Sequence, residues 1–137
     1  MTDYLVDNSV WARLTLRDAA ITERLRCIER SPSDLFVTCP PQVLEFCHSA
    51  RSAQEHAAYR EQISLGFPLE GAPSESLLLD IQSALWSAGL VRAAGTVDIL
   101  IAGYAIVNDA VVLTADHDFD HIAAVTTLRH EYIAPSS

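Results

Sequence analysis

Short apolar runs that do not alternate with polar residues constrain the fold of this chain more than any other feature. Residues 4–6, 35–38 and 111–114 each read as a strand, and helical patterns separate them. A strand that faces water on one side alternates apolar and polar side chains, whereas a strand buried on both faces does not. Strands that alternate with helices therefore predict an α/β fold, a mostly parallel sheet flanked by helices.

The remaining segments supply the connections between these strands. We expect Asn8 or Ser9 to cap the first helix and Thr96 to cap the buried helix over 97–106. The Gly- and Pro-containing residues 66–74 are expected to form one long loop. The other expected elements are helices over 8–14, 18–30, 40–47 (with a possible continuation towards 63), 74–86 and 120–123, and a last strand over 130–133.

The bulk properties indicate one compact domain. A chain of 137 residues, half of them hydrophobic, is long enough for a single core, so residues 1–137 are expected to form one domain. The longest apolar run, 99–107, is too short for a membrane span, and the N-terminus lacks the layout of a signal peptide. The three cysteines, Cys27, Cys39 and Cys47, form no C-x-x-C pair, so we expect neither a disulfide framework nor a zinc site. We expect them to be small core residues of a protein in the reducing cytoplasm.

The charge balance narrows the function classes. The net charge is −9, and all nine cationic residues are arginine. Without lysine there is no Walker A loop, and the lysine-dependent receiver and dehalogenase classes lose support. Nucleic-acid binders usually carry a basic surface. Either the chain does not meet nucleic acid, or its acids are clustered and offset by a metal or a basic partner, with arginines such as Arg13, Arg17 and Arg51 grouped locally.

Four acids occupy related positions in the predicted fold. Asp7 and Asp116 follow strands directly, and Glu45 and Asp98 lie early in apolar helices that follow a connection. In a parallel sheet, strand ends and the following helix starts lie on one edge, where α/β proteins bind ligands. Each acid alone has an ordinary explanation as a helix-dipole partner, a turn residue or a solvated side chain. Together they predict a shared crevice.

Clustered carboxylates repel one another, so such a crevice implies either raised pKa values or a bound divalent cation. Oxygen ligands without a cysteine select Mg²⁺ or Mn²⁺, which can activate water and neutralise a phosphodiester. Ser9 is placed to orient a carboxylate or a metal-bound water. Two other candidate metal groups are weaker: His117 with His121 lacks the glutamate of H-E-x-x-H, and Glu45 with His48 is a single copy of a di-iron motif.

At these acids the chain resembles the PIN-domain ribonucleases, and more narrowly the toxins of VapBC-type toxin–antitoxin systems. The matching motifs span most of the chain: Leu5-Val6-Asp7-Asn8-Ser9, Pro41-Gln42-Val43-Leu44-Glu45, Val97-Asp98-Ile99-Leu100-Ile101-Ala102 and the stretch 113–123. Asn8 departs from the Thr or Ser that is common in the family. The resemblance implies that Asp7, Glu45, Asp98 and Asp116 are the catalytic acids and that Asp7, Asp98 and Asp116 hold the metal.

The same resemblance implies supporting roles for Ser9 and Asp118 around those acids. It also implies a Mg²⁺- or Mn²⁺-dependent endoribonuclease that serves as a type II toxin, with RNA as substrate and a cognate antitoxin as partner. A Trp-bearing surface, from Trp11 or Trp86, would suggest a homodimer within that complex. Two alternatives remain: a non-catalytic PIN-like binding module, and a metal-dependent phosphatase or DNase that uses the same acids.

Overall fold

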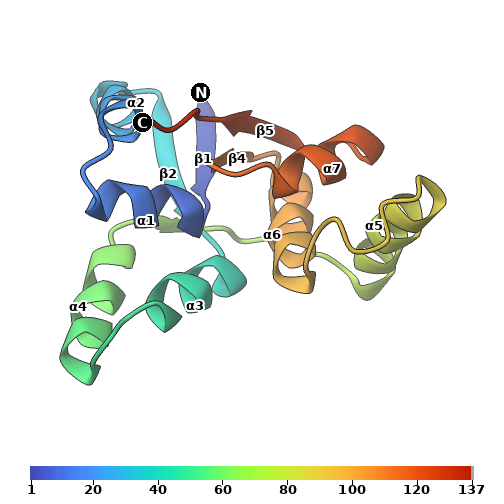
Figure 1. Ribbon diagram of the computed structural model, residues 1–137, viewed down its shortest axis with the longest axis horizontal. Helices are drawn as coiled ribbons and strands as arrows, with labels where there is room; N and C mark the ends of the chain where they lie inside the picture. The colour runs from blue at the N-terminus through green and yellow to red at the C-terminus, as the bar shows by residue number, and fades with distance from the viewer. Residues whose placement is uncertain (137) are drawn as a thin grey trace.

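The computed structural model describes residues 1–136 and shows a five-stranded sheet covered by helices on both faces (Figure 1). The strands follow the order β3-β2-β1-β4-β5, and all four neighbouring pairs are parallel. The predicted α/β class is confirmed. The strands are β1 (Thr2–Val6), β2 (Asp34–Thr38), β3 (Phe67–Pro68), β4 (Val111–Thr114) and β5 (Arg129–Tyr132).

Seven helices connect these strands in the described part of the chain. They are α1 (Asn8–Thr15), α2 (Ala19–Arg30), α3 (Pro40–His48), α4 (Ala53–Ile63), α5 (Glu75–Ser87), α6 (Thr96–Val107) and α7 (Asp118–Val125). None of the helices in residues 1–136 is both long and apolar enough to cross a membrane.

The two faces of β1 show why its apolar residues do not alternate with polar ones. Leu5 packs into the core that α5, α6 and α7 cover. Tyr4 and Val6 point the other way, into the core that α1 and α2 cover. A smaller cluster at Phe46 joins α3 to α4. Because both faces are buried over Tyr4–Val6, this part of the central strand leaves no position for a solvated side chain, while Thr2 and Asp3 at its start are partly exposed.

Several local predictions are wrong at element boundaries. Asp7, not Asn8 or Ser9, caps α1, because its own carboxylate accepts the hydrogen bond from the backbone N–H of Ser9. Gly95 precedes α6, and Thr96 is already helical. The predicted long loop contains β3, which pairs with the end of β2. A two-residue Phe-Pro segment gives no strand signal in the sequence, because proline lacks the N–H that a sheet uses.

The C-terminal elements and one cysteine also differ from expectation. Helix α7 begins at Asp118 and ends at Val125, two residues beyond the prediction at each end, and β5 runs from Arg129 to Tyr132. Cys39 and Cys47 are buried as expected, but Cys27 is exposed. Cys27 lies on the outer side of α2, whose buried residues are Ile21, Leu25 and Ile28.

Candidate active site

Asp7 occupies the centre of the sheet edge. It follows β1, the middle strand, and only 3% of its surface is exposed. Ser9 Oγ donates a hydrogen bond of 2.6 Å to Asp7 Oδ2, and Thr114 Oγ1 donates another of 3.1 Å to the same oxygen. Burial raises the pKa of Asp7, and repulsion from Asp116 adds to the rise, while the hydrogen bonds from Ser9 and Thr114 oppose it. The buried charge therefore depends on these two hydroxyls.

Ser9 and Thr114 also fix the turn that carries Asp116. Ser9 Oγ accepts a hydrogen bond of 3.0 Å from the backbone N–H of Ala115, and Thr114 Oγ1 accepts one of 3.3 Å from that of Asp116. The backbone N–H of Asp118 donates to Asp116 Oδ1 over 3.1 Å. The predicted supporting role of Ser9 thus has a geometric basis in contacts to both strand ends. For Asp118 the contact comes from the backbone, and its side chain is exposed.

Asp98 approaches the same edge from the first turn of α6. Its Oδ2 accepts a hydrogen bond of 3.4 Å from the backbone N–H of Gly95. Burial, followed by repulsion from Asp7 and Asp118, raises the pKa of Asp98 to about 7. A carboxylate in the first turn of a helix is ordinarily favoured by the helix dipole. Here the repulsion and the burial outweigh that effect, which distinguishes Asp98 from a simple capping residue.

Glu45 completes the group from α3. Burial raises its pKa first, and repulsion from Asp7 and Asp116 raises it further. Electrostatic interactions thus connect Glu45 to Asp7 and Asp116, and they connect Asp98 to Asp7 and Glu45. The four predicted acids come from four different elements and lie within interaction range of one another at one edge of the sheet.

Two residues that the sequence did not single out hold this arrangement in place. Thr114 is fully buried and contacts both Asp7 and Asp116, as described above. Gln42, 2% exposed, donates from Nε2 to the carbonyl oxygen of Val6 over 2.6 Å and accepts at Oε1 from the backbone N–H of Cys39. It joins α3, and so Glu45 one turn later, to the end of β1. In the sequence, Gln42 and Thr114 are each distinguished only as a polar residue between two apolar neighbours.

In three of the acids, only one of the two carboxylate oxygens accepts hydrogen bonds. Asp7 and Asp98 accept hydrogen bonds only at Oδ2, and Asp116 accepts them only at Oδ1, among the contacts within residues 1–136. The second oxygen of Asp7 has no partner within those residues, and it retains contact with solvent despite the burial of the residue. Each of these acids is therefore oriented through one oxygen, and its other oxygen makes no hydrogen bond within residues 1–136.

This donor set suits a hard divalent cation in its chemistry, but it is not a closed cage. No three His, Cys, Asp or Glu side chains in the described residues are arranged so that they could hold a metal ion together. Mg²⁺ retains several waters and often takes only one or two carboxylates, so an open acidic crevice fits it better than a full set of protein ligands would. Direct contact of all three predicted ligands, Asp7, Asp98 and Asp116, with one ion would require their side chains to move.

Two histidines contact Asp120 near the start of α7. His117 precedes α7, and its Nδ1 lies 2.8 Å from Asp120 Oδ2. His130 Nε2 lies 2.7 Å from the other oxygen of Asp120. These two contacts lower the pKa of Asp120.

The family model of the PIN domain matches residues 4–125. The chain belongs to the PIN domain family. The match includes Asp7, Glu45, Asp98 and Asp116, so the whole candidate site lies inside the PIN domain. No curated protein matches the sequence.

Solved structures share this PIN fold at low sequence identity. A chain of VapBC2 from Rickettsia felis, bound to a DNA fragment from its promoter, matches with a TM-score of 0.74 and 13% identity, over 96% of this chain and 98% of that one. VapBC-1 from nontypeable Haemophilus influenzae matches with a TM-score of 0.72 and 20% identity over the same shares. VapBC-5 from Mycobacterium tuberculosis, a member of the VapBC family of toxin–antitoxin systems, matches with a TM-score of 0.68 and 18% identity, over 97% and 100%.

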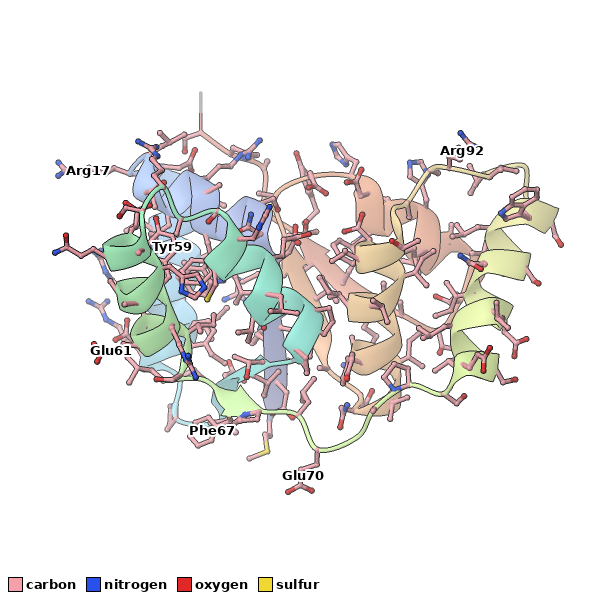
Figure 2. All side chains as sticks on the ribbon, turned by 90° about the horizontal axis from the view of Figure 1, so that it is seen from below. Arg17, Tyr59, Glu61, Phe67, Glu70 and Arg92 are labelled. Carbon is pink, nitrogen blue, oxygen red and sulfur yellow. The ribbon has the colours of Figure 1, made fainter. Side chains whose placement is uncertain are left out.

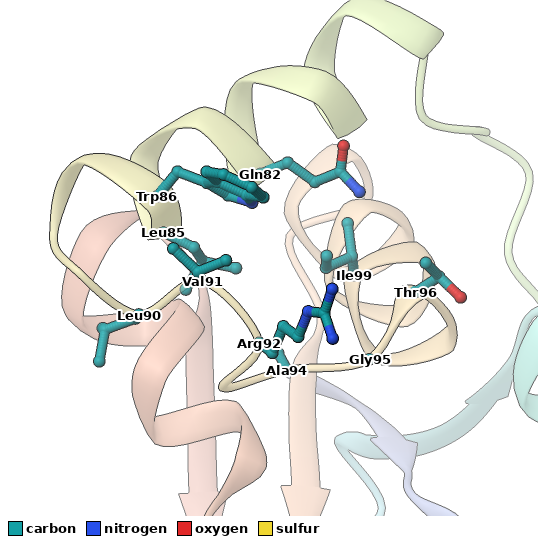
Figure 3. A pocket seen from close by; sticks show the side chains of 10 residues that line it. All are labelled: Gln82, Leu85, Trp86, Leu90, Val91, Arg92, Ala94, Gly95, Thr96 and Ile99. Atoms are coloured by element: carbon teal, nitrogen blue, oxygen red, sulfur yellow. The ribbon is translucent and has the colours of Figure 1, made fainter.

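A cavity of about 410 Å³ lies between α5 and α6 (Figure 3). Trp86 and Leu85 line it from α5, and Arg92 and Gly95 line it from the connection that leads into α6. None of the four acids contributes to its wall. The chemistry of the carboxylates, rather than the volume of this cavity, identifies the candidate active site.

Proposed function

We propose that this PIN domain, spanning residues 1–137, is a Mg²⁺- or Mn²⁺-dependent endoribonuclease that acts as a cytoplasmic toxin. One observation carries the proposal: four acids from four elements meet at the carboxyl edge of a parallel sheet, where burial and repulsion from other members of the group raise the pKa of Asp7, Glu45 and Asp98. Stability alone does not favour such an arrangement, since each ionised member increases the cost of ionising the next. A divalent cation offsets that repulsion.

In the proposed mechanism Asp7, Asp98 and Asp116 would hold the cation, and each of them has one carboxylate oxygen that makes no hydrogen bond within residues 1–136. When bound, the cation would activate a water molecule and neutralise charge on the phosphodiester. Ser9 and Thr114 keep Asp7 ionised by donating to its other oxygen. They thereby counter the cost of burying its charge.

Glu45 has a different task in this mechanism. No hydrogen bond within residues 1–136 engages its carboxylate, and its pKa is raised by burial and by the neighbouring acids. A carboxylate with a raised pKa is a better proton acceptor near neutral pH than an ordinary one. We assign Glu45 the role of orienting the attacking water and accepting its proton.

The direct test is metal-dependent cleavage of single-stranded RNA by the purified protein. The substitutions Asp7→Ala and Asp98→Asn should abolish RNA cleavage in Mg²⁺. EDTA should abolish cleavage by the wild type. Asp80→Asn is the matched control, because Asp80 is an exposed acid on α5 outside the crevice. Cleavage that survives Asp7→Ala, or that persists in EDTA, would refute the assignment.

The same assay separates the competing activities. Parallel incubations with single-stranded DNA and with a small phosphate ester distinguish an RNase from a DNase or a phosphatase. Calorimetry with Mg²⁺ and Mn²⁺ tests the non-catalytic module: no heat of binding by the folded protein, together with no cleavage of any substrate, would favour that module instead.

The partner assignments rest on the structural neighbours and on one exposed surface. The matched chains come from VapBC complexes, so we propose a cognate antitoxin for this chain as well. Trp86 on α5 is 65% exposed, and Leu79 on the same helix is 53% exposed. Apolar side chains of this size favour a protein interface, and we propose a homodimer through α5.

Expression in a bacterial host tests the toxin role. The wild type alone should arrest growth, Asp98→Asn should not, and co-expression of the protein encoded beside it should restore growth. Unimpaired growth with soluble wild-type protein would count against a toxin. Sedimentation of the wild type and of Trp86→Glu tests the dimer, which that substitution should dissociate.

A further inference from the structure

His117 and Tyr132 form an exposed aromatic pair beside the acids. Their ring centroids are 4.3 Å apart with an interplanar angle of 30°. The side chain of His117 is 66% exposed, and Tyr132 is 38% exposed. His117 directly follows Asp116, and Tyr132 pairs with Thr114, whose hydroxyl contacts Asp7. The pair therefore borders the crevice at its β5 side.

The surrounding contacts hold this pair rigid. Asp120 fixes the ring of His117 through its contact with Nδ1, and it is held in turn by His130 from β5. The backbone of Tyr132 is held by the parallel pairing of β5 with β4, and its ring packs against that of His117. A ring that is already ordered loses little conformational entropy when a ligand stacks on it.

We propose that His117 and Tyr132 form a stacking platform for an unpaired base next to the cleaved phosphate of the RNA substrate. This inference rests on the proposed ribonuclease function. An acidic crevice in a protein of net charge −9 repels the phosphates of RNA, so binding must draw on contacts that do not depend on charge. Stacking of bases on His and Tyr rings is such a contact, and it requires bases that are free of a duplex.

Several arginines are already engaged with acids or lie far from one another. Arg24, Arg26 and Arg129 form ion pairs with acids of this chain. Figure 2, viewed from below, shows Arg17 and Arg92 at opposite sides of the molecule, so these two arginines do not form a common basic track. The expected local grouping of Arg13, Arg17 and Arg51 stays a prediction.

Binding of a fluorescent single-stranded oligoadenylate tests the platform, with anisotropy measured in EDTA so that no cleavage occurs. His117→Ala and Tyr132→Leu should weaken binding by about 5- to 150-fold, the range for loss of one base stack. His117→Phe and Tyr132→Phe retain the rings and should bind within about twofold of the wild type. In Mg²⁺ the same losses should appear in KM for RNA cleavage rather than in kcat.

Phe67→Leu is the matched control, because Phe67 is a 58% exposed aromatic residue on β3, at the opposite edge of the sheet. It should bind oligoadenylate as the wild type does. Unchanged binding by both His117→Ala and Tyr132→Leu would overturn the platform. So would equal loss in His117→Phe and His117→Ala, because the contact with Asp120 would then be what matters.

The two proposals fail in distinguishable ways. If the wild type cleaves RNA and both His117→Ala and Tyr132→Leu cleave it equally well, only the stacking platform is overturned. Wild-type protein that neither binds nor cleaves RNA overturns the ribonuclease and the platform together. Thermal melting of each variant identifies any loss caused by unfolding, and His117→Ala, which alters a mostly exposed side chain, keeps the test decisive if Tyr132→Leu does not fold.

Discussion

Asp98→Asn should make the metal-free protein more stable while removing its activity. The pKa of Asp98 rises from 3.8 to about 7 in the folded chain. A carboxyl whose pKa is raised by folding binds its proton more tightly in the folded state, so stability falls as pH rises from about 4 to about 7. Asparagine has nearly the same shape and carries no charge, so it avoids that loss.

The magnitude follows from the size of the shift. A rise of about 3 pKa units corresponds to about 4 kcal/mol at most, at 1.36 kcal/mol per unit. Asp98 is only partly buried, and screening by solvent reduces this to about 1–2 kcal/mol at pH 8. In a domain of this size that gain corresponds to about 3–8 °C in Tm. At pH 4, where Asp98 is protonated in the folded state and about half ionised in the unfolded state, most of this gain should be lost.

Thermal melts in EDTA at pH 4 and pH 8 measure this difference directly. The amide oxygen of asparagine can still accept the hydrogen bond from Gly95, so the cap of α6 is retained. Saturating Mg²⁺ should raise the Tm of the wild type at pH 8 but not that of Asp98→Asn. A variant that is less stable than the wild type at pH 8, or equally shifted at both pH values, would refute the electrostatic reasoning.

Three further outcomes are expected. Cleavage in Mg²⁺ should decline as pH falls below about 7, because a proton on Asp98 competes with the cation; a rate that is flat between pH 6 and pH 8 would contradict this. Ser9→Ala removes a hydrogen bond that lowers the pKa of Asp7 and should weaken Mg²⁺ binding by about tenfold in calorimetry, whereas Ser83→Ala on the exposed side of α5 should not. Gln42→Leu leaves the carbonyl of Val6 and the N–H of Cys39 without that partner and should cost about 1–3 kcal/mol in chemical denaturation, against no measurable change for the exposed Gln54→Leu.

The fold was readable from the sequence because its signals are local. The apolar runs of β1, β2 and β4 lack alternation, and the helices between them have regular apolar spacing. β3 was missed because its two residues, Phe67 and Pro68, become a strand only through long-range pairing with β2. The start of α7 was placed too late for a similar reason, since two acids in its first turn resemble a loop until the helix is in place.

The four acids were predictable as a group, but the residues that orient them were not. Strand ends and helix starts share an edge in any parallel sheet, so the positions of Asp7, Glu45, Asp98 and Asp116 follow from the order of elements. The hydrogen bonds of Gln42 and Thr114 cross 36 and 107 residues of sequence respectively, and no local pattern encodes them. Helix caps at Asp7 and Gly95 were misassigned because several neighbouring residues have the same capping chemistry.

The hydrogen bonds of Asp7 explain how a sheet core tolerates a charge that serves the site. Ser9 and Thr114 donate to the same oxygen, Oδ2, and Ser9 also accepts from Ala115 on the β4 side. These hydrogen bonds connect the Asp7 carboxylate to the ends of β1 and β4, two strands paired along the middle of the sheet. The other oxygen remains free of such contacts within residues 1–136. The carboxylate is thus rigid where it meets the fold and open where it meets the crevice, which is the arrangement that a ligand-binding acid needs.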